Sequence, residues 1–211
     1  IGDQYFEERG NSLTLTSDGG CIVAGTKSDY PNSGGNTAPS QFYIIKFGVN
    51  GNIQWQQSFG GSSDDIPNSI KQTPDGAYII AGRSLANGGD VTGNHGSSDY
   101  WIIKISASGS LLWQKSHGGS GWDEAFSIST TIDGGYIVAG KSTSNNGDVT
   151  GYHGSYDYWI VKLNETGIIQ WQKSLGGSGN DVATAIMQTT EGNYIVAGNS
   201  TSNNGDVTGN H

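Results

Sequence analysis

The stretch Ala125-Phe-Ser-Ile-Ser-Thr-Thr-Ile-Asp-Gly-Gly-Tyr-Ile-Val-Ala-Gly-Lys141 decides the fold. Its two ends, 125–131 and 136–141, are rich in β-branched and aromatic residues, which favour strands. The residues between them, 132–135, end in two glycines that can adopt the positive φ angles of a tight turn. This stretch therefore predicts an antiparallel β-hairpin.

The same signal recurs along the chain at nearly constant steps. The Ala-Gly pair of the second strand begins at residues 24, 81, 139 and 197, and the loop Gly-Asp-Val-Thr-Gly begins at residues 89, 147 and 205. A fixed period of this size indicates a repeat architecture. Residues present in every copy are expected to hold the copies together. They include the tryptophan of each Trp-Gln-(Gln/Lys)-Ser string, which is Trp55, Trp113 or Trp171.

One repeat is predicted to contain four strands. After the hairpin, residues 158–163 and 168–174 read as a third and a fourth strand, joined by the short turn 164–167. No segment has helical periodicity over a useful length. Four antiparallel strands in a repeat of this length are typical of a β-propeller blade. A linear β-solenoid is the alternative.

We therefore predict an all-β, β-propeller-like array of four-stranded antiparallel blades. Three full blades are expected at 1–60, 61–118 and 119–176, and half of a fourth at 177–211. Because such an array cannot close a ring, we expect the chain to be a fragment of a larger propeller of roughly 350 to 460 residues. A start at Ile1 instead of Met fits a processed or truncated chain.

The up-and-down strand order also predicts which loops meet. Both tight turns of a blade should lie at one end, and both long connections at the other. Loops carry most binding residues, so we expect binding at the end with the long connections.

Composition narrows the range of partners. The 211 residues carry a net charge of −9 and only ten Lys and Arg residues, which are scattered, so nucleic acid is not an expected partner. No run approaches the roughly 20 apolar residues of a membrane helix, and we expect no membrane insertion. The first residues lack the features of a signal peptide. Cys21, the only cysteine, reads as an inert buried thiol in a strand.

Three strings carry a resemblance to a known group of proteins. Asp-Gly-Gly-Tyr-Ile-Val-Ala-Gly at 133–140, the loop and third strand at 147–163, and Trp-Gln-Lys-Ser-Leu-Gly-Gly at 171–177 resemble repeats of large secreted bacterial proteins. Such proteins are common in the Bacteroidetes and often end in a secretion-sorting domain. The resemblance implies a propeller-like fold and an extracellular or cell-surface setting. It transfers no activity to particular residues, and the first long loop, 26–41, departs from the pattern.

The repeated loop offers a calcium hypothesis. Asn and Asp oxygens next to glycine turns are the ingredients of a calcium loop. One Ca²⁺ per loop would be held by Asp148 with Asp157, and in the preceding copy by Asp90 with Asp99. The spacing does not match an EF-hand, and the alternative is that the aspartates cap turns through backbone amides. No other cofactor is expected.

The repeated histidines and charged residues read as scaffold. His95 and His153 each precede an aspartate by four residues, and we interpret them as partners in internal His–Asp hydrogen bonds, because zinc would need three or four convergent ligands. Repeated aspartates at the start of the first strand and repeated lysines in the third are expected to pair between strands or blades. The aspartates are Asp65, Asp123 and Asp181, and the lysines are Lys46, Lys104 and Lys162.

Residues that do not repeat are better candidates for binding. Trp122 stands where other copies have Asp64 and Asn180. One hypothesis is a stacking platform for a sugar ring. The alternative is an aromatic side chain that covers a neighbouring blade. The platform would combine Trp122 with Tyr152, Tyr156, His117 and Glu124.

The sequence therefore predicts a non-enzymatic extracellular module for binding or structure, which presents multivalent loops on one face and gains avidity. Expected partners are glycans, cell-surface proteins, further blades or neighbouring subunits. The alternatives are a lectin-like glycan-binding propeller, a surface filament or adhesin subunit, and part of a secreted hydrolase whose active site lies elsewhere. Catalytic carboxylates act as a unique pair, and the hydrolase and phosphate-loop motifs do not occur.

Overall fold

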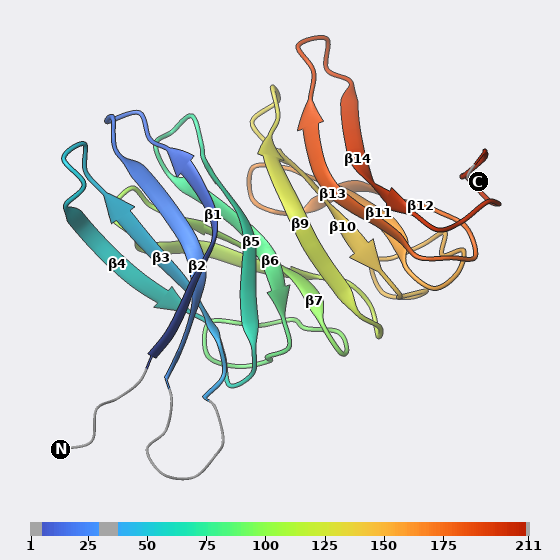
Figure 1. Ribbon diagram of the computed structural model, residues 1–211, viewed down its shortest axis with the longest axis horizontal. Coiled ribbons are helices and arrows are strands. Elements are labelled where there is room, and N and C mark those ends of the chain that lie inside the picture. Colours follow the sequence, from blue (N-terminus) through green and yellow to red (C-terminus); the bar gives the residue numbers. More distant parts are fainter. Residues whose placement is uncertain (1–5, 30–37, 210–211) are drawn as a thin grey trace.

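The computed structural model describes residues 6–29 and 38–209, which form 14 β-strands in four antiparallel sheets (Figure 1). These residues contain no helix, so the predicted all-β class is confirmed. Residues 30–37 of the first long loop lie outside the described part.

Each of the first three sheets is a meander of four consecutive strands, which we number as blades 1 to 3. Blade 1 contains β1 (Phe6–Leu15), β2 (Cys21–Asp29), β3 (Gln41–Phe47) and β4 (Ile53–Phe59). Blade 2 contains β5 (Asp65–Gln72), β6 (Tyr78–Ser84), β7 (Asp99–Ile105) and β8 (Leu111–His117). Blade 3 contains β9 (Asp123–Thr130), β10 (Tyr136–Ser142), β11 (Asp157–Leu163) and β12 (Ile169–Leu175). The fourth sheet pairs β13 (Asp181–Gln188) with β14 (Tyr194–Ser200).

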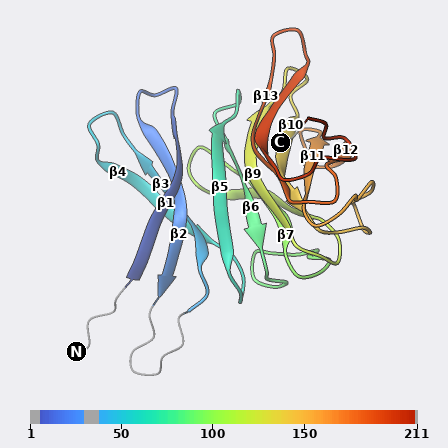
Figure 2. The ribbon, with the colours of Figure 1, turned by 45° about the vertical axis from the view of Figure 1, so that its right-hand side comes forward.

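The first strands of successive sheets lie side by side. β1 contacts β5, β5 contacts β9, and β9 contacts β13 (Figure 2). A serine links each pair, because its Oγ accepts a hydrogen bond from a backbone N–H of the next first strand. These bonds join Ser12 to Ile70 at 3.3 Å, Ser69 to Ile128 at 3.3 Å and Ser127 to Ile186 at 3.2 Å. Within the described residues the sheets form an open, propeller-like array of blades.

The middle strands are the most deeply buried. Strands β6 and β10 each have six of seven residues buried, whereas β4 and β12 each have only one. Both faces of a middle strand pack against neighbouring blades, which explains the near-continuous apolar runs. Cys21 is an exception to the prediction, since it is only half-buried at the first residue of β2.

The repeated Ala-Gly pair marks a β-bulge. In blade 3, Ala139 pairs with Ser127 but Gly140 pairs with Ala125, so Phe126 is an extra residue in β9. A Cβ atom on Gly140 would lie 2.0 Å from the carbonyl oxygen of Glu124, so only glycine fits there.

The tryptophans of the fourth strands join neighbouring blades, as the repeat predicts. Each indole ring packs against a tyrosine of the second strand in the next blade. The ring centroids are 6.1 Å apart for Trp55 and Tyr78, 6.0 Å for Trp113 and Tyr136, and 5.5 Å for Trp171 and Tyr194. A second tryptophan, on the third strand, packs against the preceding blade. The ring centroids of Trp159 in blade 3 and Tyr100 in blade 2 are 4.5 Å apart.

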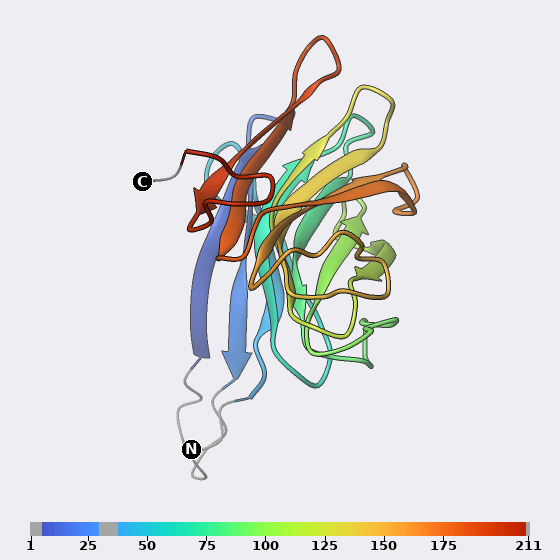
Figure 3. The same ribbon diagram turned by 90° about the vertical axis from the view of Figure 1, so that its right-hand side faces the viewer.

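The turns between first and second strands lie at one end of the array, and the long connections lie at the other end (Figure 3). We refer to the latter as the loop end. No helix in 6–29 or 38–209 is long and apolar enough to cross a membrane.

Candidate ligand-binding site between blades 2 and 3

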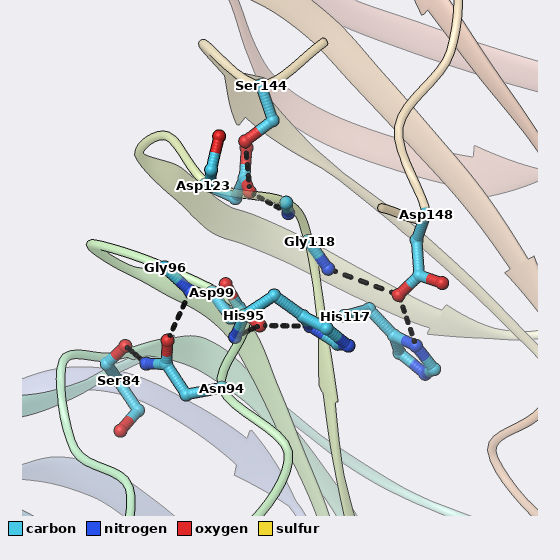
Figure 4. Close-up of polar contacts among 12 residues, drawn as sticks. Ser84, Asn94, His95, Gly96, Asp99, His117, Gly118, Asp123, Ser144 and Asp148 are labelled. Carbon is cyan, nitrogen blue, oxygen red and sulfur yellow. Dashed lines mark hydrogen bonds and ion pairs between the residues drawn. The ribbon is translucent and has the colours of Figure 1, made fainter. Parts of the chain in front are cut away.

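The repeated Gly-Asp-Val-Thr-Gly loop binds the linker between its own blade and the preceding one. In blade 3 the backbone N–H of Asp148 donates to Gly118 O at 2.9 Å, and Gly118 N–H donates to Asp148 Oδ2 at 3.3 Å (Figure 4). Gly147, with a φ of 66°, brings the loop so close that an added Cβ would lie 2.5 Å from Gly118 O. Each aspartate therefore latches its loop to a linker. The same pair of bonds joins Asp90 to Gly60 and Asp206 to Gly176.

These hydrogen bonds occupy Asp90 and Asp148, two of the aspartates in the calcium hypothesis. Burial alone would raise the pKa of Asp148, but hydrogen bonds from His117 and from Gly118 outweigh it and lower the pKa. The ionised carboxylate thus already accepts two hydrogen bonds without a metal. The described part of the chain holds no group of three or more His, Cys, Asp or Glu side chains that could bind a metal ion. We therefore interpret Asp90 and Asp148 as residues that attach their loops to the linkers.

The repeated histidines close the same loops. His95 approaches Asp99 Oδ2 through its backbone N–H at 3.0 Å and its Nδ1 at 2.7 Å (Figure 4). His153 and Asp157 repeat this at 2.6 and 3.1 Å. Burial raises the pKa of Asp99 and of Asp157, although the histidine bonds oppose it. The His–Asp spacing therefore corresponds to an internal loop clasp.

The aspartates at the start of the first strand are buried and anchor the linkers. Asp123 Oδ2 accepts hydrogen bonds from Gly119 N and Ser144 Oγ, both at 2.8 Å, and Ser142 Oγ donates to Oδ1. Asp181 makes the equivalent bonds with Gly177, Ser202 and Ser200. Asp65 accepts one from Gly61 N at 2.7 Å, and burial raises its pKa to about 6.

The expected pairing of these aspartates with the repeated lysines is wrong. The lysines lie at the opposite end of each blade and pair with an aspartate of the first hairpin turn. Hydrogen bonds from Lys104 and Thr73 lower the pKa of Asp75 to about 2, and bonds from Thr131 and Lys162 lower that of Asp133 to about 2. The ion pairs are Lys46–Asp18 at 2.8 Å, Lys104–Asp75 at 2.8 Å and Lys162–Asp133 at 2.9 Å.

Six side chains that differ between the copies meet at the loop end of the boundary between blades 2 and 3. We name this group the Trp122 cluster. It comprises Arg83 of β6, Trp122 of the linker, Glu124 and Phe126 of β9, Lys141 of β10, and Tyr156 just before β11.

Glu124 is the centre of the cluster. Its Oε1 lies 3.4 Å from Arg83 Nε, and its Oε2 lies 3.3 Å from Lys141 Nζ. Trp122 Nε1 and Asn68 Nδ2 each donate to Glu124 at 3.4 Å. Only 13% of the Glu124 side chain is exposed, so one carboxylate binds two cations away from most of the solvent.

The two cations also stack on the aromatic rings. The Arg83 guanidinium lies 4.7 Å from the centroid of Trp122, and Lys141 Nζ lies 4.8 Å from the ring of Tyr156 and 5.4 Å from that of Phe126. Such contacts stabilise by about 0.5–1 kcal/mol when exposed and about 2 kcal/mol when desolvated. Among the described residues Arg83 Nη1 is buried without a hydrogen-bond partner. Trp122 and Tyr156 remain half-buried, so each has a surface open to solvent.

The structure brings together three of the five residues proposed as a sugar platform: Trp122, Glu124 and Tyr156. His117 is not among them, because it lies at the end of the outer strand β8, where Nε2 contacts Gly167 O at 2.9 Å. Tyr152 is also separate, and its hydroxyl donates to Ser155 O at 3.4 Å within its own loop.

Sequence reasoning missed Arg83, Phe126 and Lys141. Comparing the copies position by position would have found them, because Arg83 and Lys141 stand where other copies have threonine or asparagine. The equivalent residues are Thr26 and Asn199, and those of Phe126 are Asn11, Asn68 and Thr184.

No protein-family model matches the chain. Over 169 residues it is 26% identical to the regulatory protein FlaEY of Caulobacter vibrioides, an alignment that covers 74% of this chain and 17% of that protein. Among solved structures it is similar to an apocarotenoid oxygenase variant from Synechocystis, with a TM-score of 0.42, 11% identity, and coverage of 83% of this chain and 40% of that one. A chimera of ACO and RPE65 gives a TM-score of 0.37, 11% identity, and coverage of 82% and 39%.

Proposed function

We propose that this chain is a non-enzymatic binding module of an extracellular or cell-surface protein, and that the Trp122 cluster is its ligand-binding site. One observation carries the proposal: six side chains that differ between the copies converge on one blade boundary of an otherwise repeating scaffold. The latches, His–Asp clasps and turn ion pairs recur from blade to blade, which fits a scaffold role. The Trp122 cluster is found at only one of the described boundaries.

The chemistry of the cluster favours a glycan. Sugar rings have apolar C–H faces that stack on aromatic rings, and hydroxyl groups that both donate and accept hydrogen bonds. Trp122 and Tyr156 supply partly exposed rings. Lys141 supplies N–H donors and its side chain is 20% exposed, while Glu124 holds Lys141 and Arg83 in place. This combination suits a neutral or an acidic sugar, since the cluster contains two cations and one carboxylate.

The repeated loops add a second contribution. They lie at the same end of the array as the cluster, and residues such as Asn145 and Tyr152 are exposed there. Weak contacts from loops at fixed spacing would raise the avidity for a long glycan beyond that of one site.

The test is a calorimetric titration with two oligosaccharide sets, one neutral and one containing uronic acids. We expect affinity in the millimolar to micromolar range for one set. Trp122→Ala should weaken it by about tenfold, which corresponds to about 1.4 kcal/mol of binding free energy and is within the range of one aromatic contact. Ile132→Ala is the control, because Ile132 is 77% exposed in the turn between β9 and β10, at the end of blade 3 opposite the cluster and the long loops. Equal affinity of Trp122→Ala and the unmodified chain would show that the cluster serves only as a blade contact.

A further inference from the structure

The third strands of blades 2 and 3 each insert a tryptophan against the preceding blade. Trp101 of β7 packs on Phe42 of β3, and Trp159 of β11 packs on Tyr100 of β7, in both cases with ring centroids 4.5 Å apart. Both indoles are fully buried. The hydroxyl of Tyr100 also donates to the carbonyl oxygen of Trp159 at 2.8 Å. Phe42, Tyr100 and Tyr158 occupy equivalent positions, 58 residues apart, so Tyr158 is the next member of this series.

A cavity of about 420 Å³ lies at Tyr158, where a further tryptophan would pack. Its walls include Asp181, Ser200 and Val207, which stand 58 residues after Asp123, Ser142 and Val149 of blade 3. Val91 and Val149, the counterparts of Val207, are buried in the same cores as Trp101 and Trp159. Val207 itself is only half-buried. The cavity is thus large enough for an indole, and Val207 stands where a valine packs in the core beside each of the two buried tryptophans.

The strand beside this cavity has one unpaired edge. Within the described residues β14 pairs with β13 alone, whereas β6 and β10 each have a strand on both sides. The face of β14 is correspondingly open, with Ile195 55% exposed where the equivalent Ile79 and Ile137 are fully buried. An exposed apolar strand with a free edge is a template for pairing with another strand.

We propose that the β14 edge and the Tyr158 cavity form a docking site for a β-strand of the repeat's own third-strand type, with the sequence Asp-Tyr-Trp-Ile-(Ile/Val)-Lys. In β10 and β11, Trp159 pairs with Gly140 and Asp157 with Ser142. The docked strand therefore places its tryptophan opposite Gly198, in the cavity, and its aspartate opposite Ser200. The hydroxyl of Tyr158 lies beside Gly198, as that of Tyr100 lies beside Gly140.

Charge supports the same register. The third-strand lysines Lys46, Lys104 and Lys162 each pair with an acidic residue of the hairpin turn in their own blade. In the last hairpin this position is Glu191, 58 residues after Asp133. The lysine of the docked strand therefore pairs with Glu191. This inference is independent of the proposed glycan site, which lies on a different blade boundary.

The experiment uses a fluorescent peptide with the sequence of residues 154–164, titrated into the chain and followed by fluorescence polarisation. We expect 1:1 binding, and at least tenfold weaker binding of the Trp159→Ala peptide. Val207→Lys in the chain should weaken binding by a similar factor. Val49→Lys is the matched control, since Val49 is 72% exposed in a turn of blade 1, far from the cavity. Thermal melts of both variants establish that they are folded.

Three results would overturn the proposal. The peptide could fail to bind the folded chain, or the Trp159→Ala peptide could bind as tightly as the original. Alternatively, sedimentation could show a dimer that the peptide does not dissociate, which would mean that a second copy covers β14.

Discussion

Two tryptophans on the boundary between blades 2 and 3 differ in almost every respect. Trp159 recurs as Trp101 in the preceding blade, is fully buried, and packs on an aromatic ring of the neighbouring blade. Trp122 has no aromatic counterpart in the described copies, is half-buried at the loop end, and is held by Arg83 and Glu124. The first belongs to an apolar contact that is repeated at the boundary between blades 1 and 2. Positions that recur from copy to copy thus serve stability, whereas positions that differ between the copies are available for binding.

The largest expected effect is on stability. Trp159→Ala should lower the free energy of unfolding by about 3–5 kcal/mol, because it leaves a cavity between two blades. Trp122→Ala should lower it by only about 1 kcal/mol, since it removes a partly exposed cation–π contact. Urea denaturation of both variants measures this difference. Equal losses would break the distinction between the two tryptophans.

Removal of the Asp148 latch should have an intermediate effect on the free energy of unfolding. Asp148→Ala removes the acceptor of the Gly118 bond and the partner of His117, and we expect a loss of about 1–2 kcal/mol, given that 34% of the side chain is exposed. Asp148→Asn keeps an acceptor oxygen and should lose less. Chemical denaturation of the two variants provides the measurement. A larger loss for the asparagine variant would contradict the latch geometry.

The pH dependence should differ between the two ends of a blade. Burial raises the pKa of Asp65 to about 6, above the value of about 3.9 in an unfolded chain. The folded state then binds the proton more tightly than the unfolded chain. The contribution of protonated Asp65 to the free energy of unfolding is therefore complete below about pH 4 and is lost as the pH rises through about 6. The stability of the unmodified chain relative to Asp65→Asn should therefore increase on acidification from pH 7 to 4, by at most about 3 kcal/mol.

Asp133 at the turn end should show the opposite trend. Its pKa is lowered to about 2, so its contribution is present above pH 4 and is lost as the pH falls towards 2. Denaturation curves of Asp133→Asn and the unmodified chain should therefore converge on acidification. The opposite pKa shifts of Asp65 and Asp133 would be contradicted if the two stability differences changed with pH in the same direction.

The smallest expected effect concerns calcium. Because Asp90 and Asp148 already accept hydrogen bonds from linker backbone amides, we expect the same melting temperature with calcium and with a chelator. A calcium-dependent rise in Tm that Asp148→Asn abolishes would favour the calcium-loop hypothesis instead.

The fold was largely predictable because its signals are local and recur. The strand 136–141 was placed within one residue of β10, and the turn before it contains the predicted glycines. The lysine partners were not predictable in the same way. Both candidate aspartates recur at the same period, so only the antiparallel geometry distinguishes Asp133 from Asp123 as the partner of Lys162.

The candidate site was predictable only in part. Trp122 and Glu124 are close in sequence, and their departure from the repeat was visible. Arg83 comes from another blade, and its contact with Trp122 depends on how the two sheets pack. His117 was misplaced because it ends β8, the outermost strand of blade 2, where its ring contacts Asp148 and Gly167.

An oligosaccharide titration of two variants, Trp122→Ala and Trp159→Phe, measures whether binding and scaffold positions are separate. We expect Trp122→Ala to bind about tenfold more weakly while keeping near-normal stability, and Trp159→Phe to bind normally although it unfolds more easily. Unchanged binding by Trp122→Ala, or a loss of binding in Trp159→Phe that equals that in Trp122→Ala, would contradict the separation of binding from scaffold positions.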